Sequence, residues 1–177
     1  MHGHTLYTVG HSNRSLDELL NLLLNADIGV LVDIRARPQS RRFPHFSGDM
    51  LRAAAEQAGL AYHWAGRQLG GLRESAHAAL ADGLQGFADY MDTAEFQMAA
   101  AQLARLAARA PTAILCAERM PEECHRSLIA DYLTLRGMRV IHLVDEGEMR
   151  EHRLRPEARR ESAQLIYDRH VTGRLVP

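Results

Sequence analysis

Stretches of strand length alternate along this chain with stretches of helical period. Thr5–Val9 is rich in β-branched and aromatic residues, as strands are. The leucines of 16–24 then recur at helical spacing, and Asn13 or Ser15 is placed to cap that helix. Ile28–Ile34 is a nearly continuous apolar run, typical of a strand buried on both faces of a parallel sheet. This order predicts a βαβ unit with a right-handed crossover.

The same alternation continues to the last residues. We expect further helices at 49–58, 94–109, 122–136 and 156–170, and further strands at 60–64, 112–116 and 138–144. Loops are expected at 35–48 and 72–84, with a glycine-rich turn at 66–71. The predicted fold is a three-layer α/β domain, in which an open, mostly parallel sheet has helices on both faces. The length favours one domain over residues 1–177.

Composition narrows the classes of function. No apolar run approaches the roughly 18 residues of a membrane span, and Met1–Thr5 does not read as a signal peptide, so we expect no membrane partner and a cytoplasmic location. The formal net charge of −1 gives no overall field for nucleic acid. All 21 basic residues are arginine, which excludes a Schiff-base lysine and supplies planar forks for phosphate or carboxylate.

Polar residues gather where the predicted parallel strands end. Ligands of open parallel sheets bind outside the carboxyl ends of the strands. The first strand runs into His11 and Ser12, the second into Asp33 and a loop with four arginines at 35–42, and the strand at 112–116 runs into a Cys-Glu-Arg stretch. We therefore expect these segments to form one polar site.

The two cysteines of the chain, Cys116 and Cys124, lie in one segment. Cys124, His125 and Arg126 are expected in the first turn of a helix, where a nearby cation lowers the pKa of a thiol. Such a thiol is a nucleophile or a soft metal ligand, whereas a buried cysteine can equally be a small apolar residue. A reducing compartment argues against a structural disulfide, and a closed zinc site would need more thiols.

The loop after the second predicted strand offers cations. Arg35 and Arg37 could clamp a phosphate or carboxylate, or the loop could be solvated with one arginine paired to Asp33 or Glu118. Asp33 ends an apolar run and needs a partner if it is buried, for which Arg35 is the nearest candidate. His11 could move a proton or make a structural hydrogen bond.

Four blocks of sequence resemble a known family. They are Thr8-Val9-Gly10-His11-Ser12, then Asp33-Ile34-Arg35 with Pro38 and Ser40, then Leu69-Gly70-Gly71, and finally Cys116-Ala117-Glu118 with Cys124-His125-Arg126 and Ile129-Ala130. In this order they are similar to the bacterial and archaeal family of domain of unknown function 488, with Ile34 in place of an expected valine. The resemblance implies a fold and a set of site positions but no reaction.

A looser likeness connects the chain to rhodanese-type sulfurtransferases. Leu31–Arg35 and the later strand-Cys-loop-Arg-helix order carry it. The spacing is wrong for the tight loop of backbone N–H groups that those enzymes close over their cysteine, because Cys116 lies ten residues before Arg126 and Cys124 only two.

Three functions remain open from the residues. The leading hypothesis is an enzyme that acts on a phosphorylated or nucleotide-like substrate, the second a non-catalytic module that binds nucleotide or nucleic acid, and the third a metal-dependent Cys/His site. The expected catalytic residues are His11, Cys116, Glu118, Cys124 and His125. The expected substrate-binding residues are Ser12, Asp33, Arg35, Arg37, Ser40, Gly70, Gly71 and Arg126. Neither the cofactor nor the oligomeric state follows from the sequence.

Overall fold

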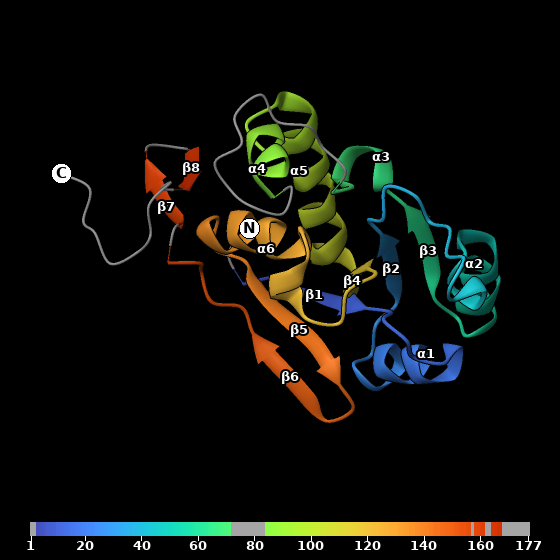
Figure 1. Ribbon diagram of the computed structural model, residues 1–177. Coiled ribbons are helices and arrows are strands. Elements are labelled where there is room, and N and C mark those ends of the chain that lie inside the picture. Colours follow the sequence, from blue (N-terminus) through green and yellow to red (C-terminus); the bar gives the residue numbers. More distant parts are fainter. Residues whose placement is uncertain (1–2, 72–83, 157, 162–163, 168–177) are drawn as a thin grey trace.

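The computed structural model describes residues 3–71, 84–156, 158–161 and 164–167, and its centre is a six-stranded sheet (Figure 1). The strands are β1 (Thr5–Gly10), β2 (Val30–Asp33), β3 (Ala61–Trp64), β4 (Thr112–Cys116), β5 (Arg139–Asp145) and β6 (Glu148–Glu151). Their spatial order is β3-β2-β4-β1-β5-β6, with β6 alone antiparallel. The predicted mostly parallel α/β sheet is confirmed.

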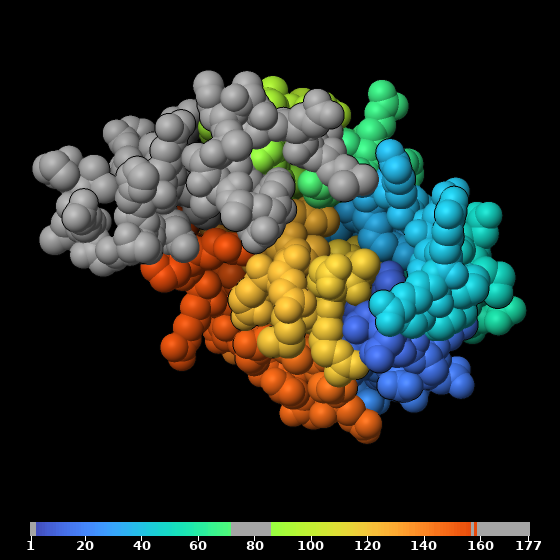
Figure 2. All heavy atoms as spheres, viewed as in Figure 1, coloured from blue at the N-terminus to red at the C-terminus, as the bar shows by residue number. Residues whose placement is uncertain are grey.

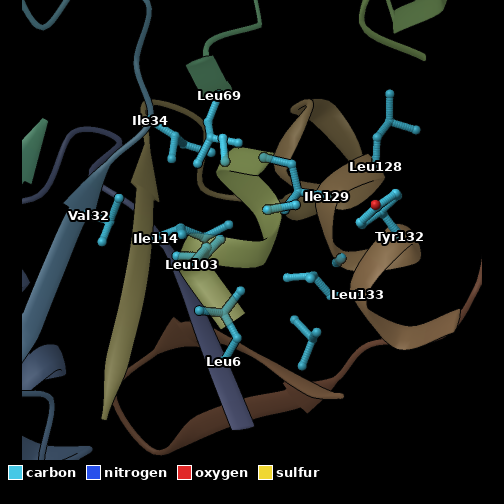
Figure 3. Close-up of a cluster of buried hydrophobic side chains, with 14 of the residues drawn as sticks. Leu6, Val32, Ile34, Leu69, Leu103, Ile114, Leu128, Ile129, Tyr132 and Leu133 are labelled. Atoms are coloured by element: carbon cyan, nitrogen blue, oxygen red, sulfur yellow. The ribbon is translucent and has the colours of Figure 1, made fainter. Parts of the chain in front are cut away.

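Helices cover both faces of this sheet. On the first face, α1 (Leu16–Asn25) and α2 (Gly48–Gln57) bury leucines against β1, β2 and β4. On the second face, α5 (Ala94–Arg109) and α6 (Arg126–Leu135) do the same, as the side chains of Figure 3 show. We call these the α1/α2 face and the α5/α6 face. Each strand sends alternate side chains to the two faces, which therefore hold separate apolar cores.

Local chemistry explains where the first helix begins. Ser15 Oγ accepts from the Glu18 N–H at 3.1 Å, and Glu18 Oε1 accepts from the Ser15 N–H at 3.2 Å. This reciprocal capping box satisfies two backbone donors at the helix start. Of the two predicted caps, Ser15 is the one that the structure shows.

The end of the described chain differs from the prediction. Where a helix was expected at 156–170, β7 (Ala158–Glu161) and β8 (Gln164–Tyr167) form an antiparallel pair. The Leu-Ile-Tyr stretch of β8 has high strand propensity, and pairing between the two strands satisfies their backbone groups as well as a helix would. The arginines that give the segment its amphipathic pattern are compatible with a helix and with a strand, so the pattern alone did not distinguish the two.

The helix expected from residue 122 also begins later. Pro121–Glu123 is a 3-10 turn, labelled η3, and Cys124 is extended at φ −136° and ψ 149°. His125 is the N-cap of α6, so Cys124 and His125 precede the helix instead of lying in its first turn. Pro121 suits the first position of this short turn, because its fixed φ fits a helical start and its missing N–H is not needed there. The extended Cys124 can then direct its side chain toward β4.

Shorter elements complete the fold. The predicted glycine-rich turn contains a short helix, α3 (Gly66–Leu69), and η1 (Pro44–Phe46) lies in the expected loop after β2. Neither β6 nor α4 (Leu84–Tyr90) was predicted. Most of the loop expected at 72–84 lies outside the described residues. Within the described part of the chain, no helix has both the length and the apolarity for a membrane crossing.

Candidate functional site

The thiol centre is a cluster of Cys116, Cys124, His125 and Arg126 at the carboxyl end of β4, on the α5/α6 face. Cys124 Sγ lies 2.7 Å from Cys116 Sγ, and both cysteines are free and buried. Arg126 Nη1 lies 2.7 Å from Cys116 Sγ. The predicted meeting of these residues is therefore what the structure shows.

The electrostatics of this centre separate the two thiols. Burial alone would raise the pKa of Cys116, but the hydrogen bond from the Cys124 thiol and the charge of Arg126 outweigh it and lower the pKa to about 7. The hydrogen bond to Cys116, together with burial, raises the pKa of Cys124. Cys116 is thus the more acidic of the two thiols, and Cys124 is the thiol that donates to it.

Arg126 is held in place by the main chain. Its Nη1 donates to the Glu118 carbonyl, and its Nη2 donates to the Arg119 carbonyl at 2.7 Å. The side chain is 1% exposed, so its charge acts on Cys116 without competition from water. Glu118 accepts the Arg126 hydrogen bond through its backbone carbonyl, although the residue is exposed.

Two glycines make room for the thiol centre. A Cβ on Gly10 would lie 1.6 Å from the Glu118 carbonyl oxygen, and a Cβ on Gly71 would lie 2.6 Å from His125 Nδ1. Gly70 packs in the same way, since its Cβ would lie 2.8 Å from Ala36. These positions explain the glycines of the first and third sequence blocks by close approach of the backbone.

His125 extends the centre toward α3. Its Nε2 lies 2.8 Å from the Leu69 carbonyl, which can only accept, so Nε2 carries the proton. In the neutral ring, Nδ1 then presents its lone pair 3.4 Å from Cys124 Sγ. A histidine in this tautomer can accept the proton of the Cys124 thiol.

A second cluster of predicted residues lies on the α1/α2 face. His11 stacks on Phe46 with ring centroids 4.6 Å apart, and its Nδ1 donates to the Ser12 carbonyl at 2.9 Å. Burial lowers the pKa of His11, so the ring is neutral near pH 7 with Nε2 as the unprotonated nitrogen. We call His11, Asp33, Arg35, Phe46 and Tyr62 the His11 cluster.

A buried ion pair anchors the His11 cluster. Arg35 Nη2 lies 2.7 Å from Asp33 Oδ2 and Arg35 Nε 2.9 Å from Asp33 Oδ1, so the predicted partnership is confirmed. Tyr62 donates its hydroxyl to the same carboxylate at 2.5 Å. Desolvation and the adjacent Asp33 raise the pKa of Tyr62. The guanidinium of Arg35 is therefore held by Asp33 instead of facing a ligand.

The residues of the predicted single site thus form two clusters, which lie at the same edge of the sheet but on its opposite faces. Backbone pairing joins them, since the His11 N–H donates to the Cys116 carbonyl at 3.0 Å and the Ser12 N–H to the Ala117 carbonyl at 2.9 Å. The remaining predicted positions line the edge: Arg37 is exposed, and Ser40 Oγ accepts from the Phe43 N–H at 2.9 Å.

The sequence reasoning missed a buried polar chain beside the thiol centre. Thr8 Oγ1 lies 2.6 Å from His142 Nδ1, His142 Nε2 lies 2.8 Å from His152 Nδ1, and His152 Nε2 lies 2.7 Å from Asp131 Oδ1. Asp131 among the apolar residues of 128–133 was the available signal, because a buried carboxylate requires partners.

The geometry gives no support to the metal hypothesis. Among the residues that the structure describes, no group of three or more His, Cys, Asp or Glu side chains is arranged to hold a metal ion. The Arg126 guanidinium already lies 2.7 Å from Cys116 Sγ. A guanidinium and a metal ion would also repel each other at this distance.

The fold and these clusters define an open α/β domain with a paired-thiol centre at the carboxyl end of its sheet. A family model for domain of unknown function DUF488 matches residues 15–133, and the chain belongs to that family. The comparison with curated proteins found no match, and neither did the comparison with solved structures. The likeness to rhodanese-type sulfurtransferases is not confirmed.

Proposed function

We propose that this protein is a thiol-dependent enzyme in which Cys116 is the nucleophile. The observation that carries the proposal is the Cys116 sulfur between the Arg126 guanidinium and the Cys124 thiol, each 2.7 Å away. This environment lowers the pKa of Cys116 to about 7, so a large fraction is thiolate at neutral pH. Thiolates, and not thiols, are the nucleophiles of cysteine enzymes.

Each neighbour of the sulfur has a role in the proposed reaction. The Cys116 thiolate forms a bond to the electrophilic atom of the substrate, and the leaving group departs with the electron pair of the bond that breaks. The Cys124 thiol holds the proton nearest to that sulfur, and His125 Nδ1 lies 3.4 Å from Cys124 Sγ to exchange it. Arg126 stabilises the thiolate before attack and after its release.

The substrate class that we propose is phosphorylated or nucleotide-like. Arg35 and Arg126 are buried and bonded within the chain, so they position other groups instead of meeting the anion. Arg37, Arg41 and Arg42 are exposed in the loop after β2 and offer guanidinium forks at the same sheet edge. Since Cys116 is only 2% exposed, a substrate reaches the sulfur when the segments that cover it move apart.

The test is turnover of a panel of nucleotides and phosphate esters, followed by mass spectrometry of the protein. We expect Cys116→Ser to abolish turnover and any covalent adduct, because a serine hydroxyl is not ionised near pH 7. Cys124→Ser keeps a hydrogen-bond donor beside Cys116 and should retain part of the turnover. Wild-type turnover by Cys116→Ser would contradict the proposal.

A non-catalytic module that binds nucleotide or nucleic acid is the second candidate. The exposed arginines 37, 41 and 42 favour it, as does the cation–π contact of Arg42 with Phe43, 5.4 Å from the guanidinium carbon to the ring centroid. Binding that falls steeply with salt and is unchanged in Cys116→Ser would favour this function over the enzyme.

A further inference from the structure

A cavity of about 650 Å³ lies outside both clusters described above. Its walls come from η3, the start of α6, β5, β6 and the segment that follows β6. Figure 2 shows the neighbourhood, where the yellow surface of residues around η3 and α6 meets the orange surface of the β5–β6 pair. The described lining contains neither thiol and neither His11 nor Arg35.

Two arginines in the wall of this cavity have buried N–H groups with no acceptor. Arg150 Nη1 donates to Glu122 Oε1 at 3.3 Å, and Arg155 Nη2 donates to Ser127 Oγ at 2.5 Å. The Nε atoms of both guanidiniums are buried without a hydrogen-bond partner. Arg155 Nε forms an ion pair with Asp131 Oδ2 at 3.8 Å, a distance too long for a hydrogen bond. Buried donors are nearly always paired in folded proteins, so we expect a bound acceptor near these two arginines.

Part of the cavity wall is polar and linked by hydrogen bonds. His142 and His152 line it, and both belong to the chain of hydrogen bonds that runs from Thr8 to Asp131. The Asp131 carboxylate accepts a hydrogen bond from His152 and one from the backbone N–H of Arg155 at 3.3 Å, so these two partners stabilise its charge. The two glutamates of the wall, Glu122 and Glu151, are about 60% exposed (62% and 60%) and lie in high dielectric.

We propose that this cavity binds the phosphate group of a small phosphorylated molecule. Arg150 and Arg155 both line the cavity and each has an Nε–H donor without an acceptor, and arginine recognises the oxygens of a phosphate through parallel hydrogen bonds. The exposed Arg153 adds a third cation to the wall. The volume lies within the range of about 300–1,000 Å³ that small-molecule sites occupy. The site does not require that Cys116 react.

The test follows the arginine Nε–H resonances of the full-length protein by NMR during titration with inorganic phosphate. We expect the signals of Arg150 and Arg155 to shift together and to saturate. Arg150→Gln, which removes one donor set, should weaken phosphate binding about tenfold. Arg105→Gln makes the same charge change on the exposed side of α5 and should leave the affinity unchanged.

Three results would overturn the proposal. They are the absence of any saturable shift at Arg150 and Arg155, an unchanged affinity in Arg150→Gln, and acetate binding as tightly as phosphate. Arg150→Lys keeps the charge and loses the planar fork, so it serves if Arg150→Gln does not fold, and it should also weaken binding. Phosphate binding is read on these resonances and not on turnover, so its failure is distinguishable from failure of the thiol chemistry.

Discussion

The guanidinium of Arg126 lies 2.7 Å from the sulfur of Cys116, and both side chains are almost wholly buried. A charge so close in a medium of low dielectric acts far more strongly than it would in water. The second thiol, Cys124, donates to the same sulfur from 2.7 Å. This arrangement has consequences for oxidation, for packing and for the ionisation of Cys116.

Oxidation should join the two cysteines. With hydrogen peroxide as oxidant, the Cys116 thiolate forms a sulfenic acid and releases hydroxide, which takes up a proton to become water, and the Cys124 thiol then displaces a second water to give a disulfide. We expect intact mass spectrometry to show the loss of two hydrogens and peptide mapping to place the bond between residues 116 and 124. The Cys124→Ser variant should stop at the sulfenic acid, which a dimedone adduct reports. Stable over-oxidation of Cys116 in the unaltered protein would contradict this.

Gly10→Ala should disturb the thiol centre. The new Cβ would lie 1.6 Å from the Glu118 carbonyl oxygen and 2.8 Å from Arg126 Nη1, so the loop that holds Arg126 must shift. We expect slower alkylation of Cys116 at pH 7 and a lower melting temperature. Gly29→Ala is the matched control, because its nearest contact is the Pro111 carbonyl oxygen at 4.0 Å. Equal behaviour of the two variants would show that Gly10 does not support the centre.

The buried ion pair should matter more than an exposed one. Asp33→Ala leaves the Arg35 charge buried without its carboxylate, and removing one partner of such a pair costs about 3–5 kcal/mol of unfolding free energy. Glu151→Ala breaks the pair with Arg139, whose side chains are 60% and 58% exposed, and should cost less than about 1 kcal/mol. Urea denaturation of both variants measures the two values, and a similar loss in each would contradict the account.

The fold was predictable from the sequence to a greater extent than the site. Strands with apolar runs, such as 112–116, and the alanine-rich helix at 94–109 agree with their predicted bounds because period and composition point to the same element. The β7–β8 pair was not predicted, since pairing between strands depends on tertiary contacts that the local pattern does not encode. The edge strand β6 was not predicted, for the same reason.

The sequence predicted that the candidate site residues lie at one sheet edge, but it did not predict their division between two faces. The strand-end rule places His11 and Cys116 at one edge, and the structure keeps them there. Cys116 pairs with Gly10, and His11 is the next residue of the chain, so the alternation of side chains directs His11 toward Phe46 on the α1/α2 face while Cys116 lies in the core of the α5/α6 face. The hydrogen bonds that link Thr8, His142, His152 and Asp131 join elements far apart in sequence, so no local motif indicated them.

Acid should destabilise the fold through His142. Burial, with nearby His152 and Arg126, lowers the pKa of His142 from 6.5 to about 3. Between these values the unfolded chain binds a proton that the folded chain does not, so stability falls as the pH falls, by about 1.4 kcal/mol per unit. His142→Gln should flatten the pH dependence of the unfolding free energy below pH 6.5 by about that slope. The exposed His63→Gln is the control and should leave the slope unchanged.

The central claim is that Arg126 and Cys124 hold Cys116 as a thiolate, and the pH dependence of its alkylation by iodoacetamide tests this most directly. Peptide mass spectrometry assigns the rate to Cys116 at each pH. We predict a midpoint near 7 in the unaltered protein and an upward shift of the midpoint in Arg126→Gln, because the cation that favours the thiolate is lost. A midpoint near 9 in the unaltered protein, or no shift in the variant, would contradict the account.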